Sequence, residues 1–466
     1  MRRPRATIER TTPGDLMQLA SDFPGSPMQV AAVLMFGPGS ALDLAAVRGV
    51  LDRRLHAVPR LRQRLVRAPF GAGRPIWVDD PDFDIRAHVN SVDCPAPYDR
   101  SAMFGVIAGT MSRRLVRNRP LWSATLITSL SDGGAALVVT LHHVLADGIG
   151  GLAVLACLVD GAPATPDTVF PRPPPRRRAV FLDATATRCR ALSHLPAKAR
   201  HLRSAMAALT TGGVAGPPPS SLNQPIGSHR GVADVRVDLA SVQRTAHAHS
   251  ATVNDVVLTA VTGALHGLLC QRGETVDRFV ISVPVAGRRS ASAGHLGNEV
   301  GVMTVPVTVT GDLHQRLAAI ARTTRRRRPA TPNASAALLG PVFRTLAWLG
   351  VLRWFVNRQH LVSTMVTNIR GSDAGLFLLG AQILEIIPVT PITGNVTVAF
   401  AVLSYAGTLT VTVTADPRCC PDLPALVARL QDELDLIATD QPPEPVPEAS
   451  IRVLCAAEQP TAGRLP

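Results

Sequence analysis

The most informative stretch of this chain is Leu137-Val138-Val139-Thr140-Leu141-His142-His143-Val144-Leu145-Ala146-Asp147-Gly148. An apolar run typical of a buried strand leads directly into two adjacent histidines, and an aspartate and a glycine follow. Imidazole is the side chain best suited to take a proton near neutral pH, and a strand end holds it rigidly. Glycine lets the backbone turn sharply toward a following helix. The stretch therefore predicts a strand, a turn that carries a general base, and a helix.

His142 and His143 should point to opposite faces of the strand, because successive side chains alternate. One imidazole would then face an interface and the other the packing around the strand. Asp147 lies just beyond the strand end, where it can accept a hydrogen bond from an imidazole or pair with an arginine. The alternative is a structural histidine pair that is held by hydrogen bonds.

The sequence lacks the residue patterns that a zinc site or a covalent nucleophile would need. Zinc would require a third ligand, and none follows His142 and His143 at a fixed spacing, so we expect no metal. No G-x-S-x-G elbow is present, and the cysteines lack the local context of a nucleophile. A histidine without a nucleophile indicates direct transfer, in which the base deprotonates a hydroxyl that attacks an activated acyl group.

Composition restricts the class of protein. The 466 residues are enough for two or three domains, and the 46% hydrophobic and 18% charged residues are typical of a globular chain. The net charge of +14 comes almost wholly from arginine and suits anionic partners such as nucleotide-bearing cofactors or lipid headgroups. Aromatic residues make up only 4%, and no stacking platform accompanies the basic runs. We therefore expect no nucleic-acid partner.

The sequence also indicates a compartment. Seven scattered cysteines without C-x-x-C spacing favour a reduced, cytoplasmic environment. We see no secretory signal in residues 1–12 and no apolar run of about 18 residues. The basic run Arg325–Arg328 and the apolar segment Leu338–Phe355 together indicate peripheral contact with an anionic membrane. A solvated run beside a core helix is the alternative.

Strand and helix patterns alternate in two halves of similar size. We expect a first domain over 1–160, a Pro/Arg-rich crossover linker with a helix over 161–225, a second domain over 226–445 and a tail over 446–466. Two α/β domains would share an interface, which is the natural place for a substrate tunnel. The predicted elements include a helix over Leu42–Leu65, a hairpin over Trp122–Leu141 and a helix after Thr252. They also include strands over Arg278–Val285, Val300–Val309, Thr364–Asn368, Val396–Tyr405 and Thr408–Thr414.

The pattern His142-His143-x-x-x-Asp147-Gly148 resembles the HHxxxDG motif of the acyl-CoA-dependent acyltransferase superfamily, which includes condensation domains and chloramphenicol acetyltransferase. From about Thr12 to Ile437 the chain resembles the bacterial wax ester synthase/diacylglycerol acyltransferase (WS/DGAT) family. The resemblance implies two chloramphenicol-acetyltransferase-like α/β domains with mixed sheets and a substrate tunnel between them. Six further segments carry it in order: Pro27–Val30, Pro120–Trp122, Thr252–Val257, Gly297-Asn298, Thr367-Asn368 and Leu403–Gly407.

The resemblance implies roles for particular residues. His143 would be the general base, and Asp147 would organise the catalytic loop. The residues implied to support them are His142, Gly148, Asn254 and Asp255, the last two near the site across the domain interface. Asn298 and Asn368 can be turn or cap residues or functional ones, and the resemblance leaves both open.

The implied reaction is transfer of a long-chain acyl group from acyl-CoA, a co-substrate, to diacylglycerol or a long-chain alcohol, with no cofactor. Alternatives are another lipid or polyketide alcohol, a carrier-protein thioester as donor, or an inactive lipid-binding paralogue. The chain departs from the family after Thr367-Asn368, where Ile369-Arg370-Gly371 replaces the common proline and glycine. That departure leaves the acyl or acceptor preference open. The implied location is the cytoplasm, with the inner face of the plasma membrane or lipid bodies as sites of peripheral contact.

Overall fold

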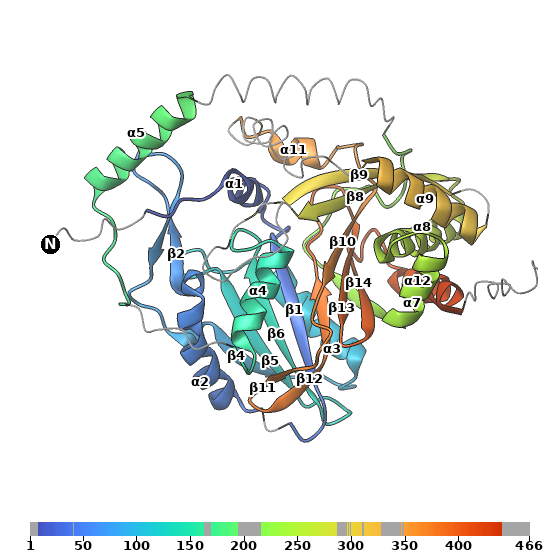
Figure 1. Cartoon of the computed structure of the whole chain (residues 1–466), viewed down its shortest axis with the longest axis horizontal. Helices are drawn as coiled ribbons and strands as arrows, with labels where there is room; N and C mark the ends of the chain where they lie inside the picture. Colours follow the sequence, from blue (N-terminus) through green and yellow to red (C-terminus); the bar gives the residue numbers. More distant parts are fainter. Residues whose placement is uncertain are drawn as a thin grey trace, which may run out of the picture.

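The computed structural model describes residues 8–40, 42–162, 169–193, 216–286, 296, 298, 300–309, 312–327, 346 and 349–439. Within them, two six-stranded sheets lie side by side (Figure 1). The first has the strand order β11-β12-β1-β6-β5-β4 and the second the order β7-β14-β13-β10-β8-β9. The first sheet comprises β1 (Gln29–Phe36), β4 (Val89–Asp93), β5 (Trp122–Thr128), β6 (Ala135–His142), β11 (Leu376–Leu378) and β12 (Ala381–Val389). The second comprises β7 (Gly231–Asp238), β8 (Arg278–Ala286), β9 (Val300–Thr308), β10 (Thr364–Arg370), β13 (Val398–Tyr405) and β14 (Thr408–Ala415).

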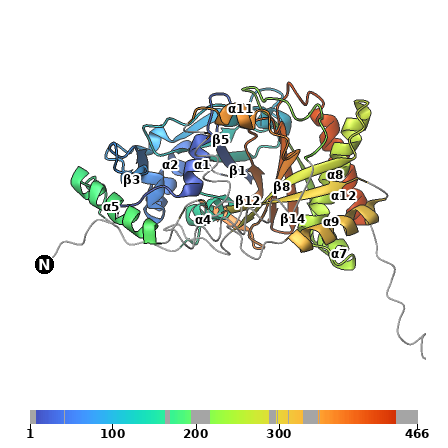
Figure 2. The same ribbon diagram turned by 90° about the horizontal axis from the view of Figure 1, so that it is seen from above.

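Helices cover the sheets. Four of them pack on the outer side of the second sheet, namely α7 (Leu239–Ala248), α8 (Val253–Gln271), α9 (Leu313–Arg327) and α12 (Leu423–Thr439) (Figure 2). On the first sheet, α2 (Leu44–Arg54) contacts α4 (Gly148–Leu158), and α3 (Arg100–Ser112) contacts both β1 and β7. Among the described helices, α8 has the length and apolar composition of a membrane span, but 72% of that stretch is buried inside the fold. The remaining described elements are α1 (Pro13–Ala20), α5 (Arg177–Ser193), α11 (Leu352–Val356) and the ribbon β2 (Gln63–Val66) and β3 (Ile76–Asp79).

Strand β6 lies inside the first sheet, and all eight of its residues are buried. It pairs with β1 on one side and with β5 on the other, and Gln29 stands opposite His142. A strand that is covered on both faces reads as a continuous apolar run rather than an alternating one. This explains why the run before the histidines predicts the strand so well.

The predicted helix over Leu42–Leu65 is wrong in its second half. Helix α2 ends at Arg54, and two short 3-10 turns lead into β2. Pro59 begins the second turn. Its ring cannot continue an α-helix, and its missing N–H removes a helical hydrogen bond.

The predicted second domain over 226–445 is not one continuous unit in the fold. Strands β11 and β12 belong to the first sheet, where β12 pairs antiparallel with β1 from Ala31 opposite Val389 to Phe36 opposite Ile383. The side chains of Ile383 and Ile386 are buried in the first core. The second half of the chain therefore completes the sheet that carries the histidines. Helix α5 lies in the predicted linker, and the predicted tail lies outside the described residues.

A partly buried ionic cluster also joins the two halves. Arg100 on α3 donates to Asp234 on β7, at 2.5 and 3.0 Å, and to Glu385 on β12, at 2.7 and 3.1 Å. Burial alone would lower the pKa of Arg100, but the hydrogen bonds to the two carboxylates outweigh it and raise the pKa. Arg100 therefore stays charged and ties both sheets to α3.

Candidate active site

The two histidines occupy the end of β6 and the first turn after it. The backbone N–H of His142 donates to the carbonyl of Leu121 at 2.9 Å, and that of His143 donates to the carbonyl of Met28 at 2.8 Å. His142 is fully buried, whereas His143 is half-buried. The two side chains therefore have different surroundings, as the alternation along the strand predicts.

His142 has a structural environment. Its Nδ1 accepts a hydrogen bond from the backbone N–H of Val144 at 3.0 Å, and its Nε2 lies 3.4 Å from a carboxylate oxygen of Asp22. Arg114 and Arg117 also donate to Asp22. Burial alone would raise the pKa of Asp22, but its hydrogen bonds with His142 and the two arginines hold that pKa well below its usual range. The result is a closed polar cluster beneath the turn.

His143 is oriented by Asn298. The side-chain amide nitrogen of Asn298 donates to Asp15 at 2.9 Å and to the carbonyl of His143 at 2.7 Å. Its Oδ1 must therefore be the atom that faces Nδ1 of His143, at 3.0 Å. An oxygen acceptor there requires a proton on Nδ1, so the neutral imidazole carries its lone pair on Nε2.

The lone pair on Nε2 is available for chemistry. No hydrogen-bond partner of this atom is found within the described part of the chain. Burial lowers the pKa of His143 below its usual value, although the hydrogen bond to Asn298 acts in the opposite direction. A neutral imidazole with a free, unprotonated nitrogen at neutral pH is the arrangement that a general base needs.

Asp147 and Gly148 begin helix α4. Asp147 is buried and caps the helix, because its side chain accepts from the backbone N–H of Gly150 at 2.8 Å. Gly148 was predicted to permit a sharp turn, but its φ is not positive. A Cβ atom at this position would instead lie 2.5 Å from Cδ1 of Ile369 on β10. The glycine is therefore explained by a close approach of the second sheet and not by backbone conformation.

Asn254 and Asp255 lie at the start of α8. Asp255 and Thr252 form a reciprocal capping box, in which Asp255 accepts from the backbone N–H of Thr252 at 2.9 Å. The other carboxylate oxygen of Asp255 accepts from the hydroxyl of Thr324 on α9 at 2.7 Å. The described hydrogen bonds of Asp255 thus stay within α8 and α9, and none joins it to His143. The predicted nearness of this pair to the site stays a prediction.

The side chain of Arg370, where the chain departs from the family, is exposed to solvent. It pairs with Asp373 at 2.7 Å. Its neighbour Ile369 is half-buried and makes the contact with Gly148. Asn368 is exposed on β10. The residue of this segment that touches the motif is therefore the isoleucine and not the arginine.

Sequence reasoning missed Asp15 and Asp22 and left Asn298 undecided. Asp15 stands in Thr12-Pro13-Gly14-Asp15, where a capping box at the start of α1 is a readable signal. Its second partner, Asn298, is 283 residues away, and no local pattern reports that contact. Asp22 has no local signal of this kind.

Two further observations concern the site. Among the described residues, no group of three or more His, Cys, Asp or Glu side chains is placed to hold a metal ion.

Two cavities, of about 520 and 340 Å³, have linings that include neither His143 nor its motif. The tunnel at His143 therefore stays a prediction.

Comparison with known proteins places this geometry in a family. The model for the wax ester synthase/diacylglycerol acyltransferase catalytic domain matches residues 12–257, and the model for the WS/DGAT C-terminal domain matches residues 296–438. The chain belongs to the WS/DGAT family. It is 32% identical over 412 residues to the "Probable diacyglycerol O-acyltransferase tgs1" of Mycobacterium tuberculosis, which covers 84% of this chain and 88% of that protein. The predicted family and the prediction of an acyltransferase are confirmed.

Two solved structures share the fold. The wax ester synthase/diacylglycerol acyltransferase of Marinobacter aquaeolei VT8 has a TM-score of 0.66 at 21% identity, and the match covers 92% of this chain and 98% of that one. The first condensation domain of the calcium-dependent antibiotic synthetase has a TM-score of 0.64 at 17% identity, with 94% and 97% covered. The predicted fold class of this WS/DGAT chain, α/β with mixed sheets in two domains, is confirmed.

Proposed function

We propose that this WS/DGAT protein transfers a long-chain acyl group from acyl-CoA to the hydroxyl of diacylglycerol or a long-chain alcohol, with His143 as general base. The observation that carries the proposal is the free Nε2 of His143, whose opposite nitrogen is held as a donor by Asn298. The acceptor class is supported by the names of the family and of the tgs1 relative.

The reaction follows from that tautomer. The acceptor hydroxyl gives its proton to Nε2 of His143 as its oxygen attacks the thioester carbonyl carbon. The carbon–oxygen bond forms and negative charge gathers on the former carbonyl oxygen. When that charge returns, the carbon–sulfur bond breaks, and the departing thiolate takes the proton back from Nε2. The products are an ester and free CoA, and His143 regains its starting state.

Asp147 takes no part in proton transfer in this scheme and has a structural role. Its carboxylate caps α4 and so fixes where the turn after His143 ends. Asn298 and Asp15 act similarly at the other side of the imidazole. These are positioning residues, and the proton passes through His143 alone.

The test replaces His143 with alanine. We expect His143→Ala to abolish ester formation from acyl-CoA while the thermal unfolding midpoint stays close to that of the unaltered protein, because His143 is only half-buried. The matched control is His229→Ala, which removes an exposed imidazole and should leave transfer unchanged. Wild-type transfer by His143→Ala would disprove the assignment.

A panel of acyl donors and alcohols, with products identified by mass spectrometry, decides the acceptor. Diacylglycerol or long-chain alcohol esters would support the proposal. Products made only from a polyketide alcohol or a carrier-protein thioester would replace it. Lipid binding without any product would indicate an inactive paralogue.

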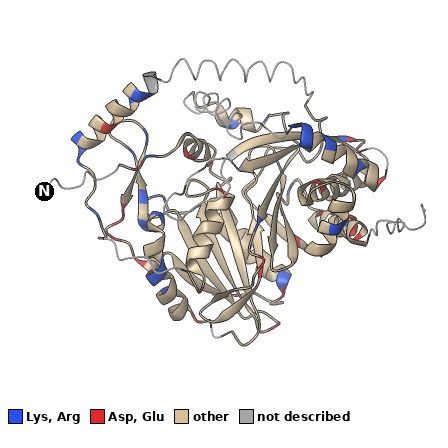
Figure 3. Ribbon diagram, in the orientation of Figure 1, with Lys and Arg blue, Asp and Glu red and all other residues tan. Residues whose placement is uncertain are grey.

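Peripheral contact with an anionic membrane, at the inner face of the plasma membrane or on lipid bodies, is a second part of the proposal. Arg325 and Arg327 each donate to a backbone carbonyl of the fold, and basic residues are spread over several elements, including α2, α5 and α9 (Figure 3). Leu349, Val351 and Trp354 are exposed at and before α11. Arg328 and residues 338–345, 347 and 348 lie outside the described residues. Co-sedimentation with phosphatidylglycerol vesicles that salt abolishes would support this contact, and no sedimentation at low salt would refute it.

A further inference from the structure

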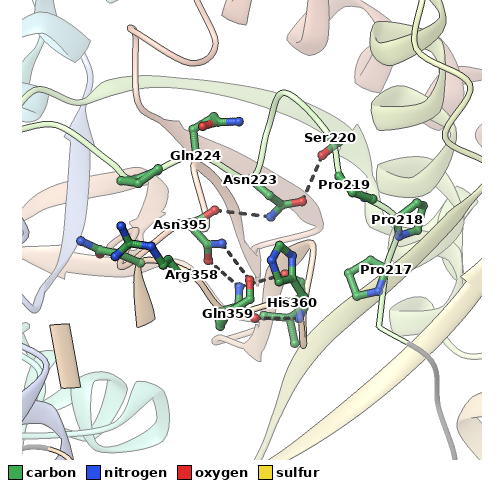
Figure 4. Close-up of a pocket in the computed structure, with 13 residues that line it drawn as sticks. Pro217, Pro218, Pro219, Ser220, Asn223, Gln224, Arg358, Gln359, His360 and Asn395 are labelled. Carbon is green, nitrogen blue, oxygen red and sulfur yellow. Dashed lines mark hydrogen bonds between the residues drawn. The ribbon is translucent and has the colours of Figure 1, made fainter. Parts of the chain in front are cut away.

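A cavity of about 520 Å³ lies in the second half of the chain, beside the start of β10. Figure 4 shows Arg358 on one side of it, Pro217–Pro219 on the opposite side, and Gln359, His360 and Asn395 between them. The described residues that line it include one guanidinium and one imidazole and no carboxylate. A cavity with a guanidinium and an imidazole in its described lining suits an anionic ligand.

The floor of the cavity is rigid. The side chain of Gln359 donates to Oδ1 of Asn395 at 2.6 Å, and Asn395 donates back to the carbonyl of Gln359 at 2.8 Å. Asn223 donates to the carbonyl of Ser363, the residue before β10, at 3.1 Å. These hydrogen bonds hold the floor of the cavity in place, and the bond to Ser363 ties it to the residue before β10.

Arg358 and His360 differ from the floor, because their side chains are exposed and form no ion pair or hydrogen bond within the described part of the chain. The guanidinium of Arg358 lies 5.4 Å from the ring centre of Trp354, which holds it in place without neutralising it. Arginine presents a fork of donors that fits phosphate oxygens. The proline wall opposite offers an apolar surface on which a flat ring can pack.

Strand β10 connects this cavity to the motif. Among the described pairings, it pairs with β8 at Thr364 and Met365, and the pairing of these two strands ends there. On β10, Met365, Thr367 and Ile369 alternate as half-buried residues, and Ile369 reaches Gly148. The strand from Thr364 to Ile369 spans about 17 Å at the usual rise per residue. The pantetheine arm of CoA is of similar length, roughly 15 Å if it extends like a polypeptide.

We propose that this cavity binds the phosphate-bearing nucleotide end of the acyl-CoA donor, with Arg358 and His360 at the phosphate groups. The pantetheine arm lies along β10 from Thr364 toward Ile369, and the thioester reaches the turn that carries His143. The inference rests on the proposed function, because that function makes acyl-CoA the donor.

The probe is adenosine 3′,5′-bisphosphate, which carries the nucleotide end without the arm, titrated calorimetrically into the full chain. We expect Arg358→Ala to weaken its binding about tenfold or more, as the loss of a charge-assisted hydrogen bond predicts. His360→Ala should weaken binding less. The matched control is Arg244→Ala, which removes an exposed arginine on α7 that donates to Ser241 of its own helix. Unchanged binding by Arg358→Ala would overturn the proposal.

Two further measurements separate the sources of phosphate. Arg358→Ala should raise the KM for acyl-CoA and leave kcat near the wild-type value, with a smaller effect for the acyl thioester of dephospho-CoA. If Arg358→Ala instead weakens sedimentation with phosphatidylglycerol vesicles and leaves nucleotide binding intact, the cavity serves a lipid headgroup and the proposal is wrong.

The outcomes for the cavity and for the reaction are distinct. Nucleotide binding that depends on Arg358, in a protein that forms no ester, would leave the cavity assigned and refute the reaction. Normal ester formation, together with nucleotide binding that Arg358→Ala does not change, would support the reaction and refute the assignment of the cavity.

Discussion

Nδ1 of His143 lies 3.0 Å from Oδ1 of Asn298, a residue 155 positions further along the chain. Asn298 is in turn anchored by Asp15, which accepts both its backbone N–H at 3.1 Å and its side-chain N–H at 2.9 Å. Three distant segments thus determine which nitrogen of one imidazole carries the proton. In the proposed mechanism, the tautomer that the base needs is therefore set before any substrate arrives.

Replacing Asn298 with alanine should lower kcat about 10- to 100-fold, because a hydrogen bond to a group that becomes charged is worth about 1.5–3 kcal/mol. The KM for acyl-CoA should change little, since Asn298 holds the base and not the donor. Steady-state kinetics on both substrates measures the split. Asn90→Ala, an exposed asparagine on β4, is the control. A rise in KM at constant kcat would contradict the positioning role.

Gly14 at the start of α1 should resist substitution. A Cβ atom there would lie 2.6 Å from the backbone oxygen of Asn298, so Gly14→Ala must displace Asn298 and lower kcat. Gly105 on α3 has nothing within 4 Å of a Cβ atom, so Gly105→Ala should stabilise the protein by about 0.5–1 kcal/mol and keep full activity. Activity assays and thermal unfolding of both variants check this contrast. Full activity of Gly14→Ala would mean that Asn298 does not hold the base.

Substitutions at Gly148 and Ile369 should have non-additive effects on activity. The added Cβ of Gly148→Ala would lie 2.5 Å from Cδ1 of Ile369, so the variant should push α4 and β10 apart and lose activity. Ile369→Val removes that Cδ1 atom, and the double variant should recover much of the loss. A double-mutant cycle on kcat/KM measures the coupling. Strictly additive losses would show that the contact does not limit glycine replacement.

Activity should extend to acidic pH. Burial lowers the pKa of His143, so the neutral base persists below the ordinary imidazole value of about 6.5. The acid limb of the kcat/KM profile should therefore fall below that value, and Asn298→Ala should move it lower still, because the Asn298 bond raises this pKa. An acid limb at or above pH 6.5 would be inconsistent with this assignment.

The folded protein should become less stable at acidic pH, although its activity extends there. Burial also lowers the pKa of His88, so both imidazoles bind protons less readily in the folded protein than in the unfolded chain. The free energy of unfolding should therefore decrease as the pH falls below about 6.5. Chemical denaturation at several pH values measures this decrease. A free energy that stays constant across that range would contradict it.

Local sequence determined the parts of this protein that depend on neighbours in the chain. The apolar run before His142 predicted the buried strand β6, and the pattern after Thr252 predicted the helix α8. Periodicity, capping and turn chemistry act over a few residues, so a pattern of a few letters reports them.

Only the tertiary structure decided which distant groups complete the site. It places Asn298 against His143 and Asp15 against Asn298, inserts β12 beside β1, and brings Cδ1 of Ile369 within 2.5 Å of where a Cβ atom of residue 148 would lie. Each of these contacts joins segments more than a hundred residues apart. Such contacts form when the two sheets pack together. Many residues in the sequence could supply a given hydrogen bond or apolar contact, and the packing determines which one does.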